Sequence, residues 1–269
     1  FGFRDATILK DSVWNVDPKH VDIYVKVNEG KKYYIRNISW VGNTVYSTDY
    51  LSRLLGMKKG DVYNQTYLSK RLSQDEDAVG NEYWNNGYLF YRLEPTEVNI
   101  VGDSIDLEMR ITEGQQAHIN RVKINGNDRL YENVVRRELR TKPGDLFSKE
   151  ALQRSARELA SMGYFDPEAI NPVPEPNYED GTVDINYNLK QKSNDQVELS
   201  LGWGQTGVIG RVGLKLTNFS MANLFRRNRE HRGIMPIGDG EVLSLSAQTN
   251  GSYYQSYNAS YSTNWFGGK

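Results

Sequence analysis

Apolar and polar residues alternate along three similar segments of this chain. Two of them, VDIYVKVNEG at 21–30 and IDLEMRITEG at 105–114, lie 84 positions apart, and VDINYNLKQK at 183–192 is a third copy. A period of two places alternate side chains on opposite faces of a β-strand. The pattern therefore predicts three strands, each with one buried apolar face. In the first strand that face consists of Val21, Ile23, Val25 and Val27.

A longer repeat has the same spacing. Residues 41–68 (VGNTVYSTDYLSRLLGMKKGDVYNQTYL) align without a gap with residues 125–152 (NGNDRLYENVVRRELRTKPGDLFSKEAL), again 84 positions on. Gly42-Asn43 and Gly60-Asp61 each have a counterpart, and glycine beside asparagine or aspartate is typical of a turn. The chain is therefore predicted to contain the same supersecondary unit twice.

Each unit is predicted to have the order β-α-α-β-β. A strand ends at the Gly-Asn turn, and a short helix with apolar side chains at helical spacing follows. A second helix starts at the candidate N-caps Asn64 and Ser148 and stops before Gly87 and Gly163. In the first unit this helix is expected to be longer by roughly two turns. Its apolar stripe is Leu68, Leu72, Val79 and Tyr83.

After Asn194 the pattern changes to strands without helices. Asn250-Gly251, between the last two strands, is a strong hairpin signal. Segments of roughly ten residues with one apolar side are typical of outer-membrane barrel strands, although four strands are too few to close a barrel, which needs about eight. A soluble four-stranded sheet is the alternative. The segments are QVELSLGWG (196–204), RVGLKLTNF (211–219), VLSLSAQT (242–249) and SYNASYSTNWF (256–266).

This order of elements resembles the BamA-type family of outer-membrane insertases, in which POTRA modules precede a β-barrel. The resemblance rests on the repeated turns, on the helix ends GYLF (87–90) and GYF (163–165), on the Glu-Gly pairs at Gly30 and Gly114, and on LGWG at 201–204. It implies α+β POTRA repeats followed by the antiparallel strands of an incomplete outer-membrane barrel. The implied parts are the end of an upstream module (1–32), two complete modules (33–115 and 116–193) and the first four barrel strands (194–269).

The resemblance also implies which strands are open to pairing. The second strand of each module is the sheet edge, by position near residues 7–14, 93–101 and 170–177. An exposed edge pairs with an incoming strand through main-chain hydrogen bonds, with little demand on sequence. The candidates for binding substrate strands are Glu97, Val98, Asn99, Ile100 and Val101 in the middle module, and Val197, Glu198, Leu199, Ser200, Leu201 and Gly202 in the first barrel strand.

The last module differs from the middle one at this edge. Pro172, Pro174 and Pro176 recur in its second strand, and proline has no N–H to donate to a pairing strand. We therefore expect the middle module, and not the last one, to accept strands by pairing.

The family implies a place in the outer membrane of a Gram-negative bacterium, with the POTRA modules in the periplasm. The function would be to receive unfolded outer-membrane β-barrel proteins and insert them into outer-membrane lipid, with accessory lipoproteins as partners. A single-client two-partner secretion pore and a non-membrane POTRA-type scaffold are the alternatives. In the barrel the lipid side would consist of Val197, Leu199, Leu201 and Trp203, and the lumen side of Glu198, Ser200 and Gly202.

Composition weighs against several other classes. The chain has 269 residues, no cysteine and a formal net charge of −1, which argues against thiolate chemistry and general nucleic-acid binding. Its three histidines are scattered and no nucleophile stands beside a base, so we expect no enzyme, no metal and no cofactor. GWGQTG (202–207) matches the dinucleotide pattern GxGxxG, but a strand is expected after it instead of the required helix.

Two charged segments have structural explanations. The family usually has a tight turn where this chain has the long connection 219–240, which carries a basic run. A solvated loop is the simplest interpretation of that run, and a lipid or partner contact is the alternative. Asp75, Glu76 and Asp77 are assigned to the solvent face of the long helix. The chain opens at FGFRDA without a signal-peptide pattern, and we expect further sequence upstream.

Overall fold

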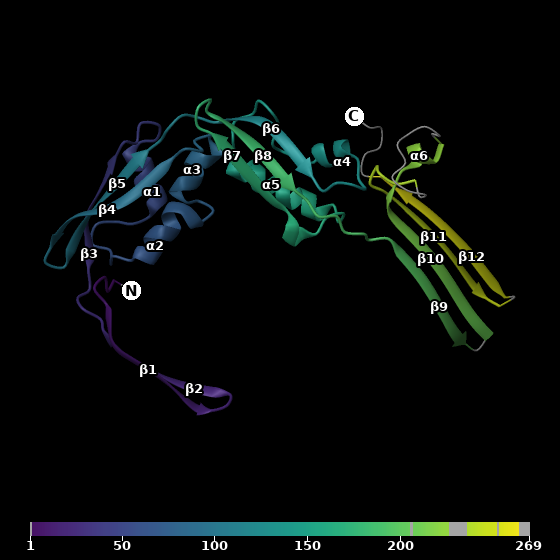
Figure 1. Cartoon of the computed structure of the whole chain (residues 1–269), viewed down its shortest axis with the longest axis horizontal. Helices are drawn as coiled ribbons and strands as arrows, with labels where there is room; N and C mark the ends of the chain where they lie inside the picture. The colour runs from purple at the N-terminus through teal and green to yellow at the C-terminus, as the bar shows by residue number, and fades with distance from the viewer. Residues whose placement is uncertain (1, 205–206, 226–235, 252, 264–269) are drawn as a thin grey trace. The chain divides into compact units, whose positions relative to one another are not determined.

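The computed structural model describes residues 2–204, 207–225, 236–251 and 253–263. Mixed α/β modules come first along the chain, and a sheet of antiparallel strands follows (Figure 1). The chain divides into two compact units, Phe1–Ala117 with Leu146–Lys149, and His118–Asp145 with Glu150–Lys269. No helix in the described ranges is long and apolar enough to cross a membrane.

The first unit begins with a hairpin of two long strands, β1 (Thr7–Asp17) and β2 (His20–Asn28). The alternation places Val21, Ile23, Val25 and Val27 of β2 on one face, opposite Ile8 and Val13 of β1 but also opposite the polar Asp11 and Asn15. That face is exposed along its whole length, and the prediction that Val21, Ile23, Val25 and Val27 are buried is therefore wrong. The physical reason is that no element among the described residues covers the hairpin.

The first complete module is a three-stranded sheet with helices packed against it. Its central strand β5 (Ser104–Thr112) pairs in parallel with β3 (Tyr34–Val41) and antiparallel with β4 (Arg92–Val101). Helix α1 (Thr48–Leu55) begins at the N-cap Ser47 and buries Leu51 in the shared core. The alternation predicted for β5 is confirmed, because its buried residues are Ile105, Leu107, Met109 and Ile111.

The second helix of this module is broken, whereas the spacing predicts one long helix. Arg71 forms ion pairs with Asp75 and Asp77, and Asn81 Nδ2 donates to the Asp75 carbonyl at 2.8 Å. Asp75 has an extended backbone, so the three carboxylates assigned to a helix face form the break instead. The expected stripe is nevertheless buried at Leu68, Leu72, Val79 and Tyr83. The pieces are α2 (Gln65–Ser69), which Asn64 caps as predicted, the π-helical turn η1 (Lys70–Gln74) and α3 (Val79–Asn85).

The second complete module repeats the arrangement with an unbroken second helix. Its central strand β8 (Thr182–Asn188) pairs in parallel with β6 (His118–Asn125) and antiparallel with β7 (Asn171–Asn177). The helices are α4 (Glu132–Arg136), α5 (Lys149–Ser161) and the short 3₁₀ helix η2 (Pro167–Ala169). Both modules therefore have the predicted order β-α-α-β-β, with η2 added before β7 in the second.

The repeated Gly-Asn turn has the same steric cause in both modules. A Cβ at Gly42 would lie 2.1 Å from the carbonyl oxygen of Ile111, and a Cβ at Gly126 would lie 1.9 Å from that of Leu189. The φ angles of the two glycines are 88° and 82°, in the left-handed region that favours glycine. The turn can therefore pack this closely against the end of the last strand only when no side chain is present.

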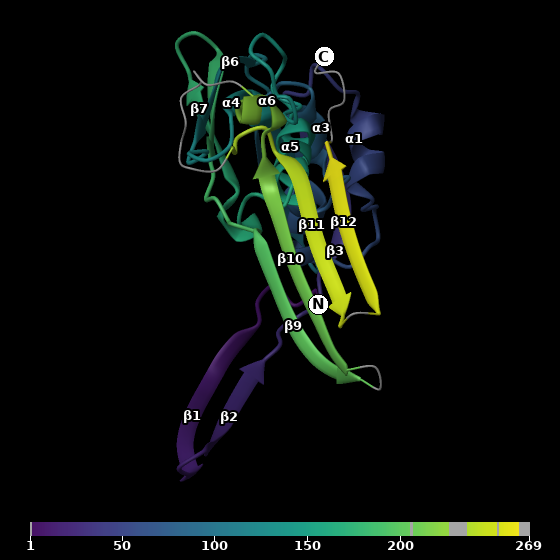
Figure 2. The same cartoon turned by 90° about the vertical axis from the view of Figure 1, so that its right-hand side faces the viewer.

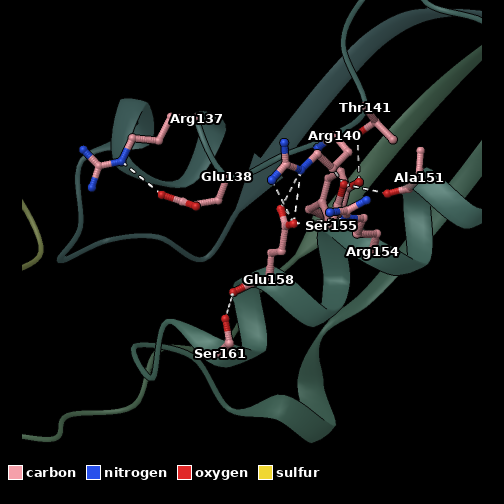
Figure 3. Close-up of polar contacts among 10 residues, drawn as sticks. Arg137, Glu138, Arg140, Thr141, Ala151, Arg154, Ser155, Glu158 and Ser161 are labelled. Atoms are coloured by element: carbon pink, nitrogen blue, oxygen red, sulfur yellow. Dashed lines mark hydrogen bonds and ion pairs between the residues drawn. The ribbon is translucent and has the colours of Figure 1, made fainter. Parts of the chain in front are cut away.

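Polar contacts hold the turn after α4 against α5 (Figure 3). Arg140 donates to the Glu158 carboxylate through Nε at 2.9 Å and Nη2 at 3.0 Å, and Arg154 Nε contacts the same carboxylate at 3.3 Å. The buried Ser155 hydroxyl accepts from the Arg140 backbone N–H at 2.8 Å and donates to the Ala151 carbonyl at 2.8 Å. Two side chains of one helix thus fix the backbone and the side chain of Arg140.

The remaining strands form one antiparallel sheet in the order β12-β11-β10-β9, with β9 at one edge (Figures 1 and 2). Strand β9 begins and ends where the alternation predicts. A short helix, α6 (Met221–Phe225), follows the second strand. The strands are β9 (Gln196–Gly204), β10 (Gly207–Phe219), β11 (Glu241–Asn250) and β12 (Tyr254–Ser262).

The connections of this sheet also bear on the sequence interpretation. Gly204 pairs with Gly207, and β10 starts at once, so the GxGxxG match is followed by a strand and lacks the helix that a dinucleotide site needs. Asn250 pairs with Tyr254, and Gly251 has a φ of 58° in the turn between them.

Candidate strand-pairing site

Strand β4 is an edge of its sheet, since within the described ranges it pairs with β5 and with no other strand. It contains the candidate run Glu97, Val98, Asn99, Ile100 and Val101, of which all but Glu97 are exposed. The register with β5 shifts between Glu97 and Asn99, so Val98 is a bulge. Bulges bend an edge strand and interrupt pairing. The regular part of this run is therefore short and lies beyond the bulge.

Glu97 is held by two side chains that sequence reasoning did not assign to the site. Arg4 Nε donates to Glu97 Oε2 at 2.7 Å, and the Tyr63 hydroxyl donates to Glu97 Oε1 at 2.8 Å. Burial, together with this hydrogen bond to a carboxylate, raises the pKa of Tyr63, so the hydroxyl stays protonated as a donor. No periodicity relates positions 4, 63 and 97, and the sequence therefore gives no signal for this contact.

Strand β7 is the corresponding edge of the second complete module. Its ladder with β8 is continuous from Asn171 to Asn177. Pro172, Pro174 and Pro176 are two residues apart, so their backbones have the same orientation in this ladder. In an antiparallel ladder, alternate residues direct both backbone groups to the partner strand or away from it. Because proline fits a sheet where its nitrogen faces away from the ladder, we infer that the open edge of β7 lacks N–H donors at these three positions.

Strand β9 pairs with β10 on one side and has no partner on the other among the described residues. It contains the second candidate run, Val197, Glu198, Leu199, Ser200, Leu201 and Gly202, and all six are exposed. Glu198 lies 3.5 Å from Arg211 of β10 in an ion pair. The backbone of this run is available for one more strand, as the sequence predicts.

The four-stranded sheet has one apolar and one polar face. Leu199, Val212, Ala247 and Tyr257 form one continuous row across β9, β10, β11 and β12. The next row, on the opposite face, consists of Ser200, Arg211, Gln248 and Ser256. On the apolar face of β9, Leu201 and Trp203 are 86% and 84% exposed. Such exposure is expected where lipid is the solvent and is unusual on a surface that faces water.

The chemistry that these edges offer is main-chain hydrogen bonding. One candidate run lies on β4 of the first compact unit, and the other lies on β9 of the second. Among the described residues, no group of three or more histidine, aspartate or glutamate side chains is placed to hold a metal ion. Each edge is therefore considered as a separate place at which a strand can add.

Some sequence interpretations fall outside the described residues. These are the arginines 226, 227, 229 and 232 of the basic run, residues 205–206 of the GxGxxG match, and the end of the fourth strand segment, 264–266. Of the long connection 219–240, the structure describes its first part up to Phe225 and its end from residue 236.

A family model matches most of the region that folds into modules. The POTRA model, described as "Surface antigen variable number repeat", matches residues 33–114 and 117–192. Its two matches coincide with the two three-stranded sheets and their helices. Together they cover more than half of the chain.

Several known proteins are similar to the whole arrangement. The outer membrane protein assembly factor BamA of Neisseria meningitidis serogroup B is 29% identical over 222 residues, which are 81% of this chain and 27% of that protein. BamA of Nitratidesulfovibrio vulgaris is 25% identical over 215 residues, 78% of this chain and 27% of that protein. The chain thus spans about a quarter of the length of these relatives.

A solved structure supports the fold. The crystal structure of BamA from Haemophilus ducreyi lacking POTRA domains 1–3 aligns with a TM-score of 0.61 at 20% identity, and the match covers 81% of this chain and 37% of that one. At this identity the likeness concerns the fold alone. It agrees with the order of modules and antiparallel strands described above.

Proposed function

Because the chain belongs to the POTRA family and is of the BamA type, we propose that it acts in the assembly of outer-membrane β-barrel proteins. In this proposal it receives unfolded barrel proteins by strand pairing and inserts them into the outer membrane. The observation that carries the proposal is the position of β9, which follows two POTRA modules and forms an exposed edge, without a second partner among the described residues, of a sheet with one apolar face.

The proposed chemistry is the addition of a strand to an open edge. Backbone N–H and C=O groups between Gln196 and Gly204 bind the backbone of an incoming strand, which explains how many different client sequences can be accepted. In lipid an unpaired backbone group costs several kcal/mol, so pairing and insertion favour each other. The apolar row that contains Leu199 then extends onto the client strand. No nucleotide and no catalytic side chain is needed for this process.

The location follows from the same family membership. The POTRA modules lie in the periplasm and the four-stranded sheet lies in the outer membrane, with Val197, Leu199, Leu201 and Trp203 toward lipid. Unfolded barrel proteins, outer-membrane lipid and accessory lipoproteins are the proposed partners. On the periplasmic side, β4 is the module edge that we assign to client strands.

The test is site-specific photo-crosslinking in cells with the full-length parent protein. A photoreactive residue at Ser200 on β9 is compared with one at Ser246, which has the same residue type but lies on β11, paired on both sides. We expect Ser200 to capture a range of barrel precursors and Ser246 to capture none. Capture of one secreted protein alone would indicate an export pore. Capture of only the protein's own last strand, at any client load, would refute the proposed pairing.

A further inference from the structure

Asp195, the residue before β9, links three segments of the second unit. Its Oδ1 accepts from the backbone N–H of Thr217 at 2.9 Å and from the Thr217 hydroxyl at 3.2 Å, and its Oδ2 lies 3.3 Å from Arg129 Nη2. The last backbone pair between β9 and β10 is Gln196 with Lys215. The Asp195 side chain therefore continues the attachment to β10 beyond the end of the ladder and connects it to the POTRA module.

Asn218, at the end of β10, makes a second set of contacts. Its buried amide donates through Nδ2 to the Arg129 carbonyl at 2.7 Å and accepts through Oδ1 from the Gly240 N–H at 3.1 Å. Gly240 in turn accepts from the Tyr164 hydroxyl at 2.6 Å. One asparagine thus joins the end of β10 to the start of β11 and to a loop of the module.

The connection after β10 is bound to the same loop. The Tyr131 N–H donates to the Gly238 carbonyl at 2.9 Å. Asn223 of α6 is buried and donates through Nδ2 to the Tyr131 hydroxyl at 2.8 Å and to the Ile237 carbonyl at 2.9 Å. This is the region in which the chain departs from the tight turn of the resembled family. Its described parts fold back onto Arg129 and Tyr131 of the second module.

We define the polar clasp as these connected groups: Arg129, Tyr131, Tyr164, Asp195, Asn218 and Asn223. All of them act on the Gln196 end of β9 or on the β10–β11 connection beside it. No contact of the polar clasp reaches the other end of β9. Apolar side chains are exposed along the whole strand, 71% and 74% at Val197 and Leu199 and 86% and 84% at Leu201 and Trp203, and Gly202 has open space beside it.

We propose that Asp195 is a positioning residue, and that the polar clasp pins the Gln196 end of β9 to the POTRA module so that the strand bends and exchanges pairing partners from its Gly204 end. An incoming strand then meets a register that is fixed at one end and adjustable at the other. The inference rests on the proposed function only in naming an incoming client strand. The pinning itself is a property of the protein without any client.

The test is amide hydrogen exchange on the full-length parent in phospholipid nanodiscs, without clients. In the wild type we expect slower exchange at Val197–Leu199 than at Leu201–Trp203. The Asp195→Ala variant should raise exchange at Val197–Leu199 by at least roughly tenfold, which corresponds to losing one charge-assisted hydrogen bond. Exchange at Ile185 and Tyr187, in the core of the module, should stay unchanged and reports whether the variant is folded.

A conservative variant separates pinning from general stability. Asp195→Asn keeps an acceptor for Thr217 but loses the ion pair with Arg129, so its effect should be intermediate, and Arg129→Ala should match it. Even exchange along β9 in the wild type, or unchanged exchange in Asp195→Ala with an intact module core, would overturn the proposal. Client capture at Ser200 is scored separately. If exchange shows no pinning but Ser200 still captures clients, the pinning proposal fails. If pinning is present but Ser200 captures no client, the proposed function fails.

Discussion

The Tyr83 hydroxyl donates to the Glu113 carboxylate over 3.0 Å in the core of the first complete module. The same carboxylate accepts from the backbone N–H groups of Thr44 and Val45, each at 2.9 Å, and from the Thr44 hydroxyl. It therefore fastens the loop after the Gly-Asn turn to helix α3 and to the end of β5. In the second module Gln191 occupies the equivalent place and accepts from the Arg129 N–H at 2.9 Å. Glu113, the first residue of a Glu-Gly pair, and Gln191 thus bind the same loop in the two modules.

We expect Glu113→Gln to lower the free energy of unfolding by roughly 1–3 kcal/mol at pH 7, because the new amide N–H₂ faces donors in a buried site. Burial disfavours the charged form of Glu113, but its hydrogen bonds outweigh this and lower its pKa from the ordinary 4.5. The stability that ionised Glu113 contributes is therefore fully present above its ordinary pKa and is lost as the pH falls through the pKa of the folded state.

The measurement for Glu113 is chemical unfolding of the purified chain at several pH values, followed by near-ultraviolet circular dichroism. The difference in the free energy of unfolding between wild type and Glu113→Gln should become smaller below pH 4.5. Glu108→Gln is the control, because Glu108 of β5 is half-buried and forms an ion pair with the exposed Arg110 two residues along, so its loss should matter by less than about 0.5 kcal/mol. If both substitutions lower the free energy of unfolding by the same amount, the stabilising role assigned to Glu113 is wrong.

Two glycines with nearly equal φ separate backbone strain from steric contact. Gly42 and Gly60 have φ angles of 88° and 92°, but a Cβ at Gly60 meets nothing within 4 Å, whereas one at Gly42 meets the Ile111 carbonyl at 2.1 Å. Gly60→Ala should cost about 1–2 kcal/mol from the left-handed conformation alone. Gly42→Ala should cost at least about 3 kcal/mol, because β5 must shift as well. Thermal unfolding of both variants checks this, and a smaller loss for Gly42→Ala would refute the steric explanation.

The repeat made most of the module fold predictable from sequence. A constant offset of 84 residues aligned the turns, and alternation located β5, β8 and β9, because strand period and burial are local properties. The broken helix was missed, although a signal exists. Between Leu72 and Val79 no apolar residue continues the stripe, and Asp75 and Glu76 stand where one would be expected. The charged run therefore marked the break.

The contacts that position the candidate edges were not predictable. Arg4 and Glu97 are separated by 93 positions, and Asn218 and Arg129 by 89. Such pairs carry no periodic signal, and their meeting depends on how whole elements pack. The exposure of the β1–β2 hairpin was missed for a related reason, since alternation shows which face is apolar and not whether anything covers it.

Arg140 and Arg154 offer a matched test of two contacts to one carboxylate. Their side chains are 56% and 59% exposed, but Arg140 makes three contacts of 2.9, 3.0 and 3.1 Å with Glu158, whereas Arg154 makes one of 3.3 Å. We expect Arg140→Ala to destabilise the module measurably more than Arg154→Ala, with both effects small and reduced in high salt. A double-mutant cycle with Glu158→Ala measures the coupling. A coupling for Arg154 as large as that for Arg140 would contradict the geometry.

The last prediction concerns the prolines of β7. If they remove outward donors from this edge, replacing Pro172, Pro174 and Pro176 together by valine should restore them and create a second pairing edge. A photoreactive residue at Val173 in the full-length parent should then capture client strands, whereas in the wild type, of the two module edges, β4 should capture them at Ile100 and β7 should not.

The control for the proline variant is Glu175→Gln, which alters the same strand but keeps all three prolines and should not create capture at position 173. Pairing of β7 in the triple variant is checked by hydrogen exchange at Asp184 and Asn186 of β8, which lie opposite Glu175 and Val173, because only N–H groups that face β7 report its pairing. Since β4 also carries Pro95 and a bulge at Val98, its capture should centre beyond the bulge, on Asn99 to Val101. Wild-type capture along Asn171 to Glu175 without capture along Glu97 to Val101 would reverse the assignment of the two edges.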